Sequence, residues 1–500
     1  MTRDTRCLRL GTALIAVLIG TALMPSVARA ESQSQRDRHD GHDLPALHAT
    51  RGDAPAIVDA DGRQVTLRGV NLNSLGDYYQ ADPNLPPVVP VTNVDWSAME
   101  AHGFNVVRLL VSWSSLEPRP GHISRSYLRR VHRAVHDARE HGIYSVIDMH
   151  QDAWGKYIAS PPGAVCPPGR SPTIGWDGAP AWATITDGAD TCTAGSREDS
   201  AAVQTAWDSF YTDRDGIMSH LVSVWSAIAR EFRDEPAVAG FDLVNEPNHG
   251  TSPNFLDGLT RYFGRSIDAI RAAEGGHGHH IVFFETTVFG VGVPASFTTD
   301  ENIVFEAHNY GESIGNLPIE GLFGYFQSLA NGYRTAMWVG EYGWFSEPAV
   351  AQEKLGRFAA KEDALITAGD AWWQWRQACG DPHSVGRPGG TPDAVLIHFQ
   401  RNGCPGDHNL GVVPEWACTW RPYPRFAPGR LTQRTADCTG NAHVAGTTEH
   451  AGTIELWYPG DAKPTVTGTN VKHIRRHRVD GGWVVTARVR HDYTLAATTA

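Results

Sequence analysis

Two glutamates stand out in this sequence because each follows a short apolar run with the length of a strand. Glu246 follows the run 238–245, and Glu341 follows the run 335–340. A charge at the end of a buried strand usually has a function. Two carboxyl groups about 5–5.5 Å apart can hydrolyse a glycosidic bond with retention, one as nucleophile and one as acid/base. The sequence therefore predicts that these two side chains share one site.

The elements that would position them alternate between apolar runs and helical segments. Eight runs are predicted as strands: 65–72, 104–111, 143–149, 238–245, 281–285, 303–307, 337–340 and 371–375. Helices are predicted over 127–141, 218–232 and 255–273. This alternation predicts an α/β fold, a (β/α)₈ TIM barrel. A doubly wound sheet is the alternative, but the sequence lacks the glycine-rich dinucleotide motif.

The predicted barrel, residues 51–420, lies between a leader and a small domain. Residues 31–50 are polar and without periodicity, so a disordered leader is expected. Residues 421–500 alternate apolar and polar side chains between turn residues, which predicts a C-terminal antiparallel β-sandwich. Within the barrel, the segment 152–200 is rich in Pro, Gly and Trp. A loop of this length in a compact domain is usually functional.

The first 30 residues have the features of a secretory signal peptide. Arginines at positions 3, 6 and 9 precede an apolar run over 10–24, and Ala28-Arg29-Ala30 provides a cleavage site. No later stretch approaches the roughly 20 apolar residues of a membrane span. Apart from Cys7 the cysteines are even in number, as expected in an oxidising compartment. We expect a secreted protein without a transmembrane segment, in which Cys166 and Cys192 would close one long loop.

The charge balance narrows the range of partners. The formal net charge is −12, from 43 basic and 55 acidic residues, which argues against a nucleic-acid-binding protein. A basic run over 472–478 is either a solvated face or a contact for anionic lipid. Sixteen tryptophans supply either core or flat surfaces for sugars and apolar groups.

Polar residues at the ends of the predicted strands are the site candidates, because barrel enzymes act at that face. Besides the two glutamates they are Arg108, His150, Asp152, Asn245, His308, Tyr310 and Trp373. Each has a structural explanation when taken alone: a buried arginine needs an ion-pair partner, and a lone histidine is often part of the core. Such groups at most of the strand ends together favour a functional site.

The order of these residues resembles glycoside hydrolase family 5, whose catalytic glutamates follow strands four and seven. The Asn-Glu-Pro motif at 245–247 and the Gly-Glu-Tyr-Gly motif at 340–343 carry the resemblance, which extends over about residues 55–420. It implies that Glu246 is the acid/base and Glu341 the nucleophile. The residue spacing itself leaves the two roles interchangeable.

The resemblance also implies roles for the supporting residues. Arg108 would keep the nucleophile ionised, Tyr310 would donate a hydrogen bond to it, and Asn245 would bind the sugar 2-hydroxyl. The walls and floor of the sugar subsite would come from His150, His308 and Trp373. No metal or organic cofactor is implied, because a mechanism with two carboxyl groups needs neither.

A finer resemblance is to the secreted endoglycoceramidases, which cleave the bond between an oligosaccharide and ceramide. It rests on the segments 148–152, 240–247 and 421–425. Asp152 would then contact a sugar hydroxyl. The segments 307–312 and 372–376 resemble members that favour galactosyl-ceramide linkages. The implied partner is a glycosphingolipid at a membrane or micelle surface, and we expect a monomer.

A ceramide group requires an apolar groove, and three alternative functions remain open. Aromatic residues expected on loops either form this groove or pack ordinarily: Trp154, Trp176, Trp182, Phe289, Phe323, Phe326 and Trp344. The alternatives are a secreted β-1,4-glucanase or mannanase, a β-glucosidase acting on lipid glycosides, and an inactive carbohydrate-binding barrel. The intact set of polar residues argues against the inactive barrel.

Overall fold

The computed structural model describes residues 44–80, 82–314, 316–344, 348–383 and 418–499. The predicted signal peptide and residues 31–43 of the predicted leader lie outside the described residues. Residues 44–50 are described, and Leu47–Thr50 form strand β1. The predicted leader is therefore wrong for this segment. Leu47 and Ala49 are buried, and a two-residue alternation is too short to stand out in a polar sequence.

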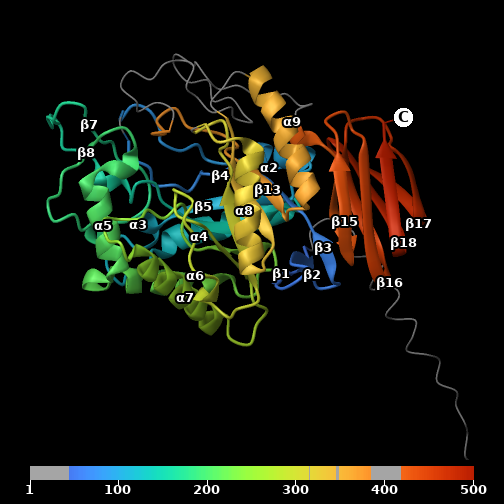
Figure 1. The fold of residues 1–500 in the computed structure, drawn as a ribbon, viewed down its shortest axis with the longest axis horizontal. Helices are drawn as coiled ribbons and strands as arrows, with labels where there is room; N and C mark the ends of the chain where they lie inside the picture. Colours follow the sequence, from blue (N-terminus) through green and yellow to red (C-terminus); the bar gives the residue numbers. More distant parts are fainter. Residues whose placement is uncertain (1–43, 81, 315, 345–347, 384–417, 500) are drawn as a thin grey trace, which may run out of the picture. The chain divides into compact units, whose positions relative to one another are not determined.

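Eight parallel strands close into a barrel, which confirms the predicted fold (Figure 1). The strands are β4 (Leu67–Leu72), β5 (Val106–Ser112), β6 (Tyr144–His150), β9 (Val238–Asp242), β10 (Ile281–Phe284), β11 (Ile303–His308), β12 (Met337–Tyr342) and β13 (Gly369–Trp372). The pairing of β13 with β4 closes the ring. Every residue of β5 and β6 is buried, as expected for parallel strands covered on both faces.

Helices lie around the barrel (Figure 1). They are α2 (Asn93–Ala101), α3 (Trp113–Leu116), α4 (Arg125–Glu140), α5 (Ala201–Tyr211), α6 (Ile217–Phe232), α7 (Phe255–Glu274), α8 (Ile319–Tyr333) and α9 (Pro348–Leu365). In α4, Leu128, Val131 and Val135 recur at helical spacing and are buried. The Ser124 hydroxyl caps this helix by accepting a hydrogen bond from the backbone of Tyr127. The three helices predicted from the sequence correspond to α4, α6 and α7.

The long segment between β6 and α5 is irregular, and a disulfide and short elements hold it in place. It contains the short pair β7 (Ser171–Pro172) and β8 (Cys192–Thr193) and the 3₁₀ turns η2 (Lys156–Ile158), η3 (Ala181–Ala183) and η4 (Arg197–Asp199). A disulfide joins Cys166 to Cys192, as predicted. A second disulfide joins Cys418 to Cys438. Among the described residues, no helix has both the length and the apolar character needed to cross a membrane.

An antiparallel sheet follows the barrel in the chain. Its C-terminal strands are β14 (Tyr423–Pro428), β15 (Arg430–Ala436), β16 (Ala442–Pro459), β17 (Thr465–Val479) and β18 (Gly482–Thr498). The N-terminal strands β1, β2 (Ala56–Asp59) and β3 (Arg63–Val65) join the same sheet, because β3 pairs with β14. β2 and β3, predicted as part of the barrel domain, are therefore strands of this sheet. Side chains of β15, β16 and β18 share one hydrophobic core.

Candidate active site

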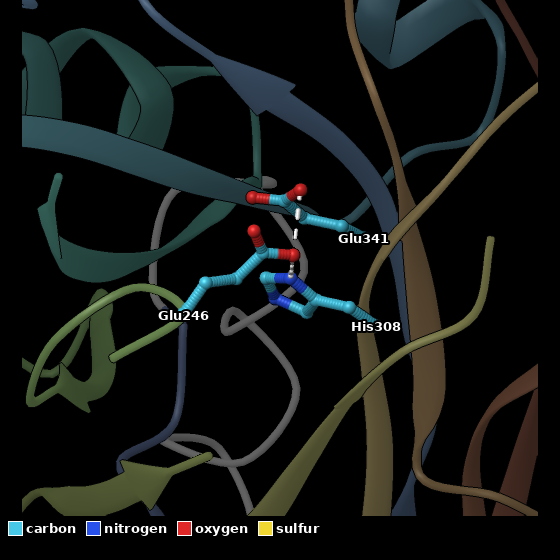
Figure 2. Close-up of side chains that lie close together, drawn as sticks. All are labelled: Glu246, His308 and Glu341. Atoms are coloured by element: carbon cyan, nitrogen blue, oxygen red, sulfur yellow. Dashed lines mark hydrogen bonds and ion pairs between the residues drawn. The ribbon is translucent and has the colours of Figure 1, made fainter. Parts of the chain in front are cut away.

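Glu246 and Glu341 meet at the carboxyl end of the barrel strands (Figure 2). Glu341 lies within β12, and Glu246 lies four residues beyond the end of β9. One carboxylate oxygen of each glutamate and one ring nitrogen of His308 all lie within 4.8 Å of one another. An inverting glycosidase needs its carboxyl groups about 6.5–9.5 Å apart to admit a water molecule. The separation here is that of a retaining pair.

The backbone around the glutamates is shaped to bring them together. Glu246 has φ of +39°, a left-handed conformation that strains a residue with a side chain. Its backbone N–H donates to Oε2 of Glu285 over 3.0 Å, and its carbonyl accepts from Gln151 over 3.0 Å. At Gly340, a β-carbon would lie 1.7 Å from Oε1 of Glu306. Glycine is therefore required at this position.

Arg108 is fully buried at the centre of a carboxylate cluster. Its nitrogens lie 3.0, 2.6, 3.0, 2.7 and 2.8 Å from oxygens of Asp148, Asp242, Glu285, Glu306 and Glu341, respectively. One cation cannot balance five buried anions. Burial and the neighbouring carboxylates raise the pKa of Asp242 well above its ordinary value and that of Glu285 to about 8. A proton on Glu285 at neutral pH reduces the excess of negative charge around Arg108.

Glu341 is held by two hydrogen bonds. Arg108 Nη1 donates to its Oε1 over 2.8 Å, and the Tyr310 hydroxyl donates to its Oε2 over 2.9 Å. His308 Nδ1 lies 3.5 Å from the same Oε2. The pKa of Glu341 is raised above its ordinary value by burial, and the charges of His308 and Arg108 oppose this rise without cancelling it. Both oxygens are thus fixed in place.

Glu246 is bound more closely by His308. The ring Nδ1 of His308 lies 2.8 Å from Oε1 of Glu246, and Nη2 of Arg197 lies 3.7 Å from Oε2. Burial alone would raise the pKa of Glu246, but the hydrogen bond and charge of His308 and the charge of Arg197 lower it. Burial disfavours the charged form of His308, but Glu285, Glu341 and Glu246 raise its pKa well above the ordinary value. In the ligand-free protein the proton of this pair therefore lies on His308.

His150, Trp373 and Asp152 form one wall beside the glutamates. The rings of His150 and Trp373 stack with centroids 5.3 Å apart and planes 18° apart. Nδ1 of His150 lies 2.8 Å from Asp148. Burial lowers the pKa of His150, but Asp148 and Asp152 outweigh it and raise the pKa to about 10. This wall is therefore rigid and carries charge.

Asp152 and Asn245 are both occupied by protein groups. Asp152 Oδ1 lies 2.5 Å from Nη2 of Arg197, and Oδ2 lies 2.9 Å from Nε2 of His383. Burial raises the pKa of Asp152, but Arg197 and His383 hold it well below the ordinary value. Asn245 accepts from Arg108 over 3.0 Å and donates to the carbonyl of Gln151 over 2.9 Å. Contacts from Asp152 and Asn245 to a sugar stay predictions.

A cavity of about 1360 Å³ opens over these residues and has two kinds of lining. The polar end contains His150, Asp152, Arg197, Asn245, Glu246, Glu285, His308, Tyr310, Glu341, Trp373 and His383. The apolar wall contains Ile174, Val288, Phe289, Ile314, Leu317, Leu322, Tyr325 and Phe326. Three of its side chains are more than half exposed: Phe289 at 52%, Ile314 at 65% and Leu317 at 62%. The cavity therefore has one polar part and one apolar part, which suits an amphiphilic ligand.

Two sets of described residues bring three possible metal ligands together. They are Glu246, His308 and Glu341, and Glu285, Glu306 and His308. In both sets the imidazole already lies between the carboxylates as a hydrogen-bond or ion-pair partner. Hydrogen bonding and charge pairing thus account for both groupings without an ion.

Proteins of known family and structure are similar to this chain. Residues 58–378 match the model of the cellulase family, glycosyl hydrolase family 5. The chain belongs to this family. A solved structure described as an endogalactoceramidase is 42% identical, with a TM-score of 0.81, over 91% of this chain and 100% of that one. Endo-glycoceramidase II from Rhodococcus sp. is 24% identical with a TM-score of 0.67 over 89% of this chain and 99% of that one, and shares the fold.

Curated relatives match a shorter part of this family 5 protein. Endoglycoceramidase I from Rhodococcus hoagii is 28% identical over 44% of this chain and 43% of its own length. An endoglycoceramidase from Hydra vulgaris is 25% identical over 51% of this chain and 53% of its own length. The chain thus spans about half the length of the curated relatives it matches.

The structure of this family 5 protein brings together every site residue predicted from the sequence and adds three that the prediction missed. Glu285 follows the fifth strand, at a strand end that was not considered. Arg197 and His383 lie on irregular segments, where no periodicity marks them. Position at the end of a strand could have identified Glu285. Nothing in the sequence identifies the other two, because their partner Asp152 is distant along the chain.

The predicted aromatic groove is only partly correct. Trp176, Phe289 and Phe326 line the cavity of the family 5 protein. The other four aromatic residues, Trp154, Trp182, Phe323 and Trp344, are absent from its lining. Trp154 packs against Trp207, and Phe323 packs against Phe358 in the core. Aliphatic side chains from the segments after β10 and β11 take the place of those four.

Proposed function

We propose that this protein hydrolyses the β-linkage between the glycan and the ceramide of glycosphingolipids, with retention at the anomeric carbon. One observation carries the proposal: a retaining pair of carboxyl groups, with oxygens within 4.8 Å, lies at the junction of a polar and an apolar half of one cavity. A glycolipid is cleaved where its polar and apolar halves meet. The 42% identity to the endogalactoceramidase supports the same substrate class.

The proposed chemical steps are as follows. Glu341 attacks the anomeric carbon while Glu246 gives a proton to the departing ceramide oxygen, which leaves a glycosyl ester on Glu341 and neutral ceramide. Glu246 then takes a proton from water as the water attacks the same carbon, which releases the glycan and restores Glu341. Arg108 and Tyr310 hold Glu341 by their hydrogen bonds and orient it for attack.

His308 is suited to supply the proton that the first step needs. In the ligand-free protein it is charged and lies 2.8 Å from Glu246. Transfer of this proton along the hydrogen bond makes Glu246 the acid and leaves His308 neutral. The 2.8 Å separation supports a proton shared by the pair.

The apolar wall would hold the ceramide. Phe289, Ile314 and Leu317 are exposed at the cavity, and burial of such side chains contributes roughly 25 cal/mol per Å² of apolar surface. A glucan substrate has no hydrocarbon chain to cover this wall. The wall therefore favours a glycolipid over the alternative of a β-1,4-glucanase or mannanase.

Galactosylceramide-based glycolipids are the proposed preferred series, from the identity to the endogalactoceramidase. The test is mass spectrometry of products from GM1 ganglioside, a galactosylceramide-based glycolipid and cellopentaose, incubated in parallel. We expect free ceramide together with an intact oligosaccharide or galactose, and most product from the galactosylceramide series. Cleavage of cellopentaose alone would overturn the proposal. Inactivity on all three would favour the carbohydrate-binding barrel.

Secretion and a monomeric state are also part of the proposal. The Cys166–Cys192 and Cys418–Cys438 disulfides support an oxidising compartment. Expression of the complete chain should give an extracellular protein that begins at Glu31, as read by N-terminal sequencing. Light scattering should give the mass of one chain. A product retained in the cytoplasm, or a stable dimer, would contradict these two points.

A further inference from the structure

Arg197 lies beside the oxygen of Glu246 that faces away from His308. Among the described residues, Oε1 of Glu246 is bonded to His308 Nδ1 at 2.8 Å, and Oε2 faces Arg197 Nη2 at 3.7 Å. The two cations thus approach the carboxylate through different oxygens, one from β11 and one from η4. Since a carboxylate shares its negative charge between both oxygens, each cation acts on the charge of Glu246.

Three contacts fix the position of Arg197. Its Nη2 lies 2.5 Å from Oδ1 of Asp152, and its Nε lies 2.7 Å from Oε1 of Glu198. Its guanidinium carbon lies 4.5 Å from the centre of the Trp176 ring. The side chain is 22% exposed, so it is largely desolvated and its charge acts strongly on near neighbours. Arg197 also lines the cavity.

We propose that Arg197 is a positioning residue that makes Glu246 a stronger acid toward a poor leaving group. The inference rests on the proposed role of Glu246 as the acid/base. As the carboxyl group of Glu246 gives its proton to the departing oxygen, negative charge grows on the carboxylate and is shared by Oε2, beside the guanidinium. A cation at 3.7 Å stabilises that charge in the transition state. An alcohol such as ceramide needs this assistance because its alkoxide is a poor leaving group.

Other titratable groups also face Glu246, and they determine the direction of the effect. They are His308 on β11, Glu341 on β12, Glu285 after β10, Asp152 after β6 and Tyr310 after β11. Loss of Arg197 removes one of two cations and leaves the charge of Asp152 without this partner. Both changes raise the pKa of Glu246. An opposite charge at this distance typically shifts a carboxyl pKa by about 1–3 units.

The test compares Arg197→Gln with Arg197→Lys on two leaving groups. Substrates are the n-octyl and the 2,4-dinitrophenyl β-glycosides of galactose and lactose; the dinitrophenyl group departs without acid assistance. For Arg197→Gln we expect kcat/KM on the octyl glycosides to fall at least about tenfold. The loss on the dinitrophenyl glycosides should be under about threefold. The alkaline limb of the octyl pH profile should move up by about 1 pH unit. Arg197→Lys should keep the limb near its wild-type position.

Arg214→Gln is the matched control, because Arg214 also pairs with a carboxylate, Asp187, but is 42% exposed. It should leave both profiles unchanged. An unmoved alkaline limb with equal losses on both leaving groups would show a merely structural role and overturn the inference. A Lys variant that behaves like the Gln variant would also overturn it. If the wild type cleaves these glycosides but no glycolipid, only the proposed substrate is overturned. If the wild type is inactive on all of them, the proposed function and the inference about Arg197 are both overturned.

Discussion

At the scale of single residues, the site controls which side chain carries the proton. Glu246 and Glu341 share His308, but His308 lies 2.8 Å from one and 3.5 Å from the other. Arg108 and Tyr310 bind Glu341 directly. Each glutamate therefore has its own hydrogen-bond partner, and this asymmetry is what lets two chemically identical side chains have different roles.

Glu246→Ala tests which glutamate is the acid/base. We expect kcat/KM for an octyl glycoside to fall by roughly 100- to 10,000-fold. With a dinitrophenyl glycoside, formation of the glycosyl enzyme should keep most of its rate, because this leaving group needs no acid. Added azide should restore turnover by attacking the glycosyl enzyme, with a β-glycosyl azide as the product seen by NMR. Glu341→Ala should show no such rescue to a β-product, and the reverse pattern would exchange the two roles.

At the scale of elements, the segment 152–200 gives the site its cations on one side. Its disulfide spans a sequence separation of 26 residues, and closing a loop of this size removes about 3 kcal/mol of unfolded-state chain entropy. Arg197 follows Cys192 by one short turn. Asp152, at the other end, is its partner. The loop and the site are thus stabilised by the same contacts.

Cys166→Ala/Cys192→Ala should loosen this loop. We expect faster limited proteolysis within residues 160–195 and a several-fold lower kcat/KM on an octyl glycoside, because Arg197 is held less firmly. The matched control is Cys418→Ala/Cys438→Ala, which removes the other described disulfide. Measured well below the melting temperature, it should leave cleavage of the loop unchanged. Equal proteolysis of both variants would contradict a local role.

The apolar wall belongs to the same scale, because the segments after β10 and β11, helix α8 and Ile174 of the segment 152–200 form it. In the double variant Ile314→Ser/Leu317→Ser, the ratio of kcat/KM for a glycolipid to that for an aryl glycoside should fall about tenfold, the factor for roughly 1.4 kcal/mol of lost binding. Val94→Ser is the control, since Val94 is 77% exposed at the start of α2. An unchanged ratio in the double variant would show that ceramide does not bind at this wall.

At the scale of the whole molecule, a buried charge network joins the barrel to the antiparallel sheet. Glu362 of α9 is fully buried and pairs with Arg421, with Arg434 of β15 at 3.0 Å and with Arg68 of β4 at 3.6 Å. Burial raises the pKa of Glu362, but these three arginines outweigh it and lower the pKa to about 2. Since the folded pKa is depressed, the carboxylate stabilises the fold above its unfolded pKa of about 4.3.

Glu362→Gln should lower the free energy of unfolding by about 3 kcal/mol at pH 7, because it leaves buried arginines without their partner. The stabilisation by Glu362 is lost as pH falls from about 4.5 toward 2, so the difference between variant and wild type should shrink at pH 3. Urea unfolding at both pH values measures this. Glu353→Gln is the control on the same helix, where the side chain is 62% exposed. A difference that stays constant with pH would contradict the assignment.

The sequence by itself determined the barrel and most of the site. Strands buried on both faces must be apolar throughout, and helices that pack on them must repeat at 3.6 residues, so both are visible along the chain. Catalytic side chains of a barrel follow its strands. Arg108, Glu246, His308 and Glu341 could therefore be named from local pattern, although local pattern could not place their protons.

Only the tertiary structure decided what depends on segments distant along the chain. Arg197 and His383 reach the site by pairing with Asp152 across loops without periodicity. β1 to β3 join the C-terminal sheet through the pairing of β3 with β14. The two glutamates also differ in their distance to His308, whose Nδ1 lies closer to Glu246 than to Glu341. Pairing and pKa depend on separation in space, which a linear pattern does not record.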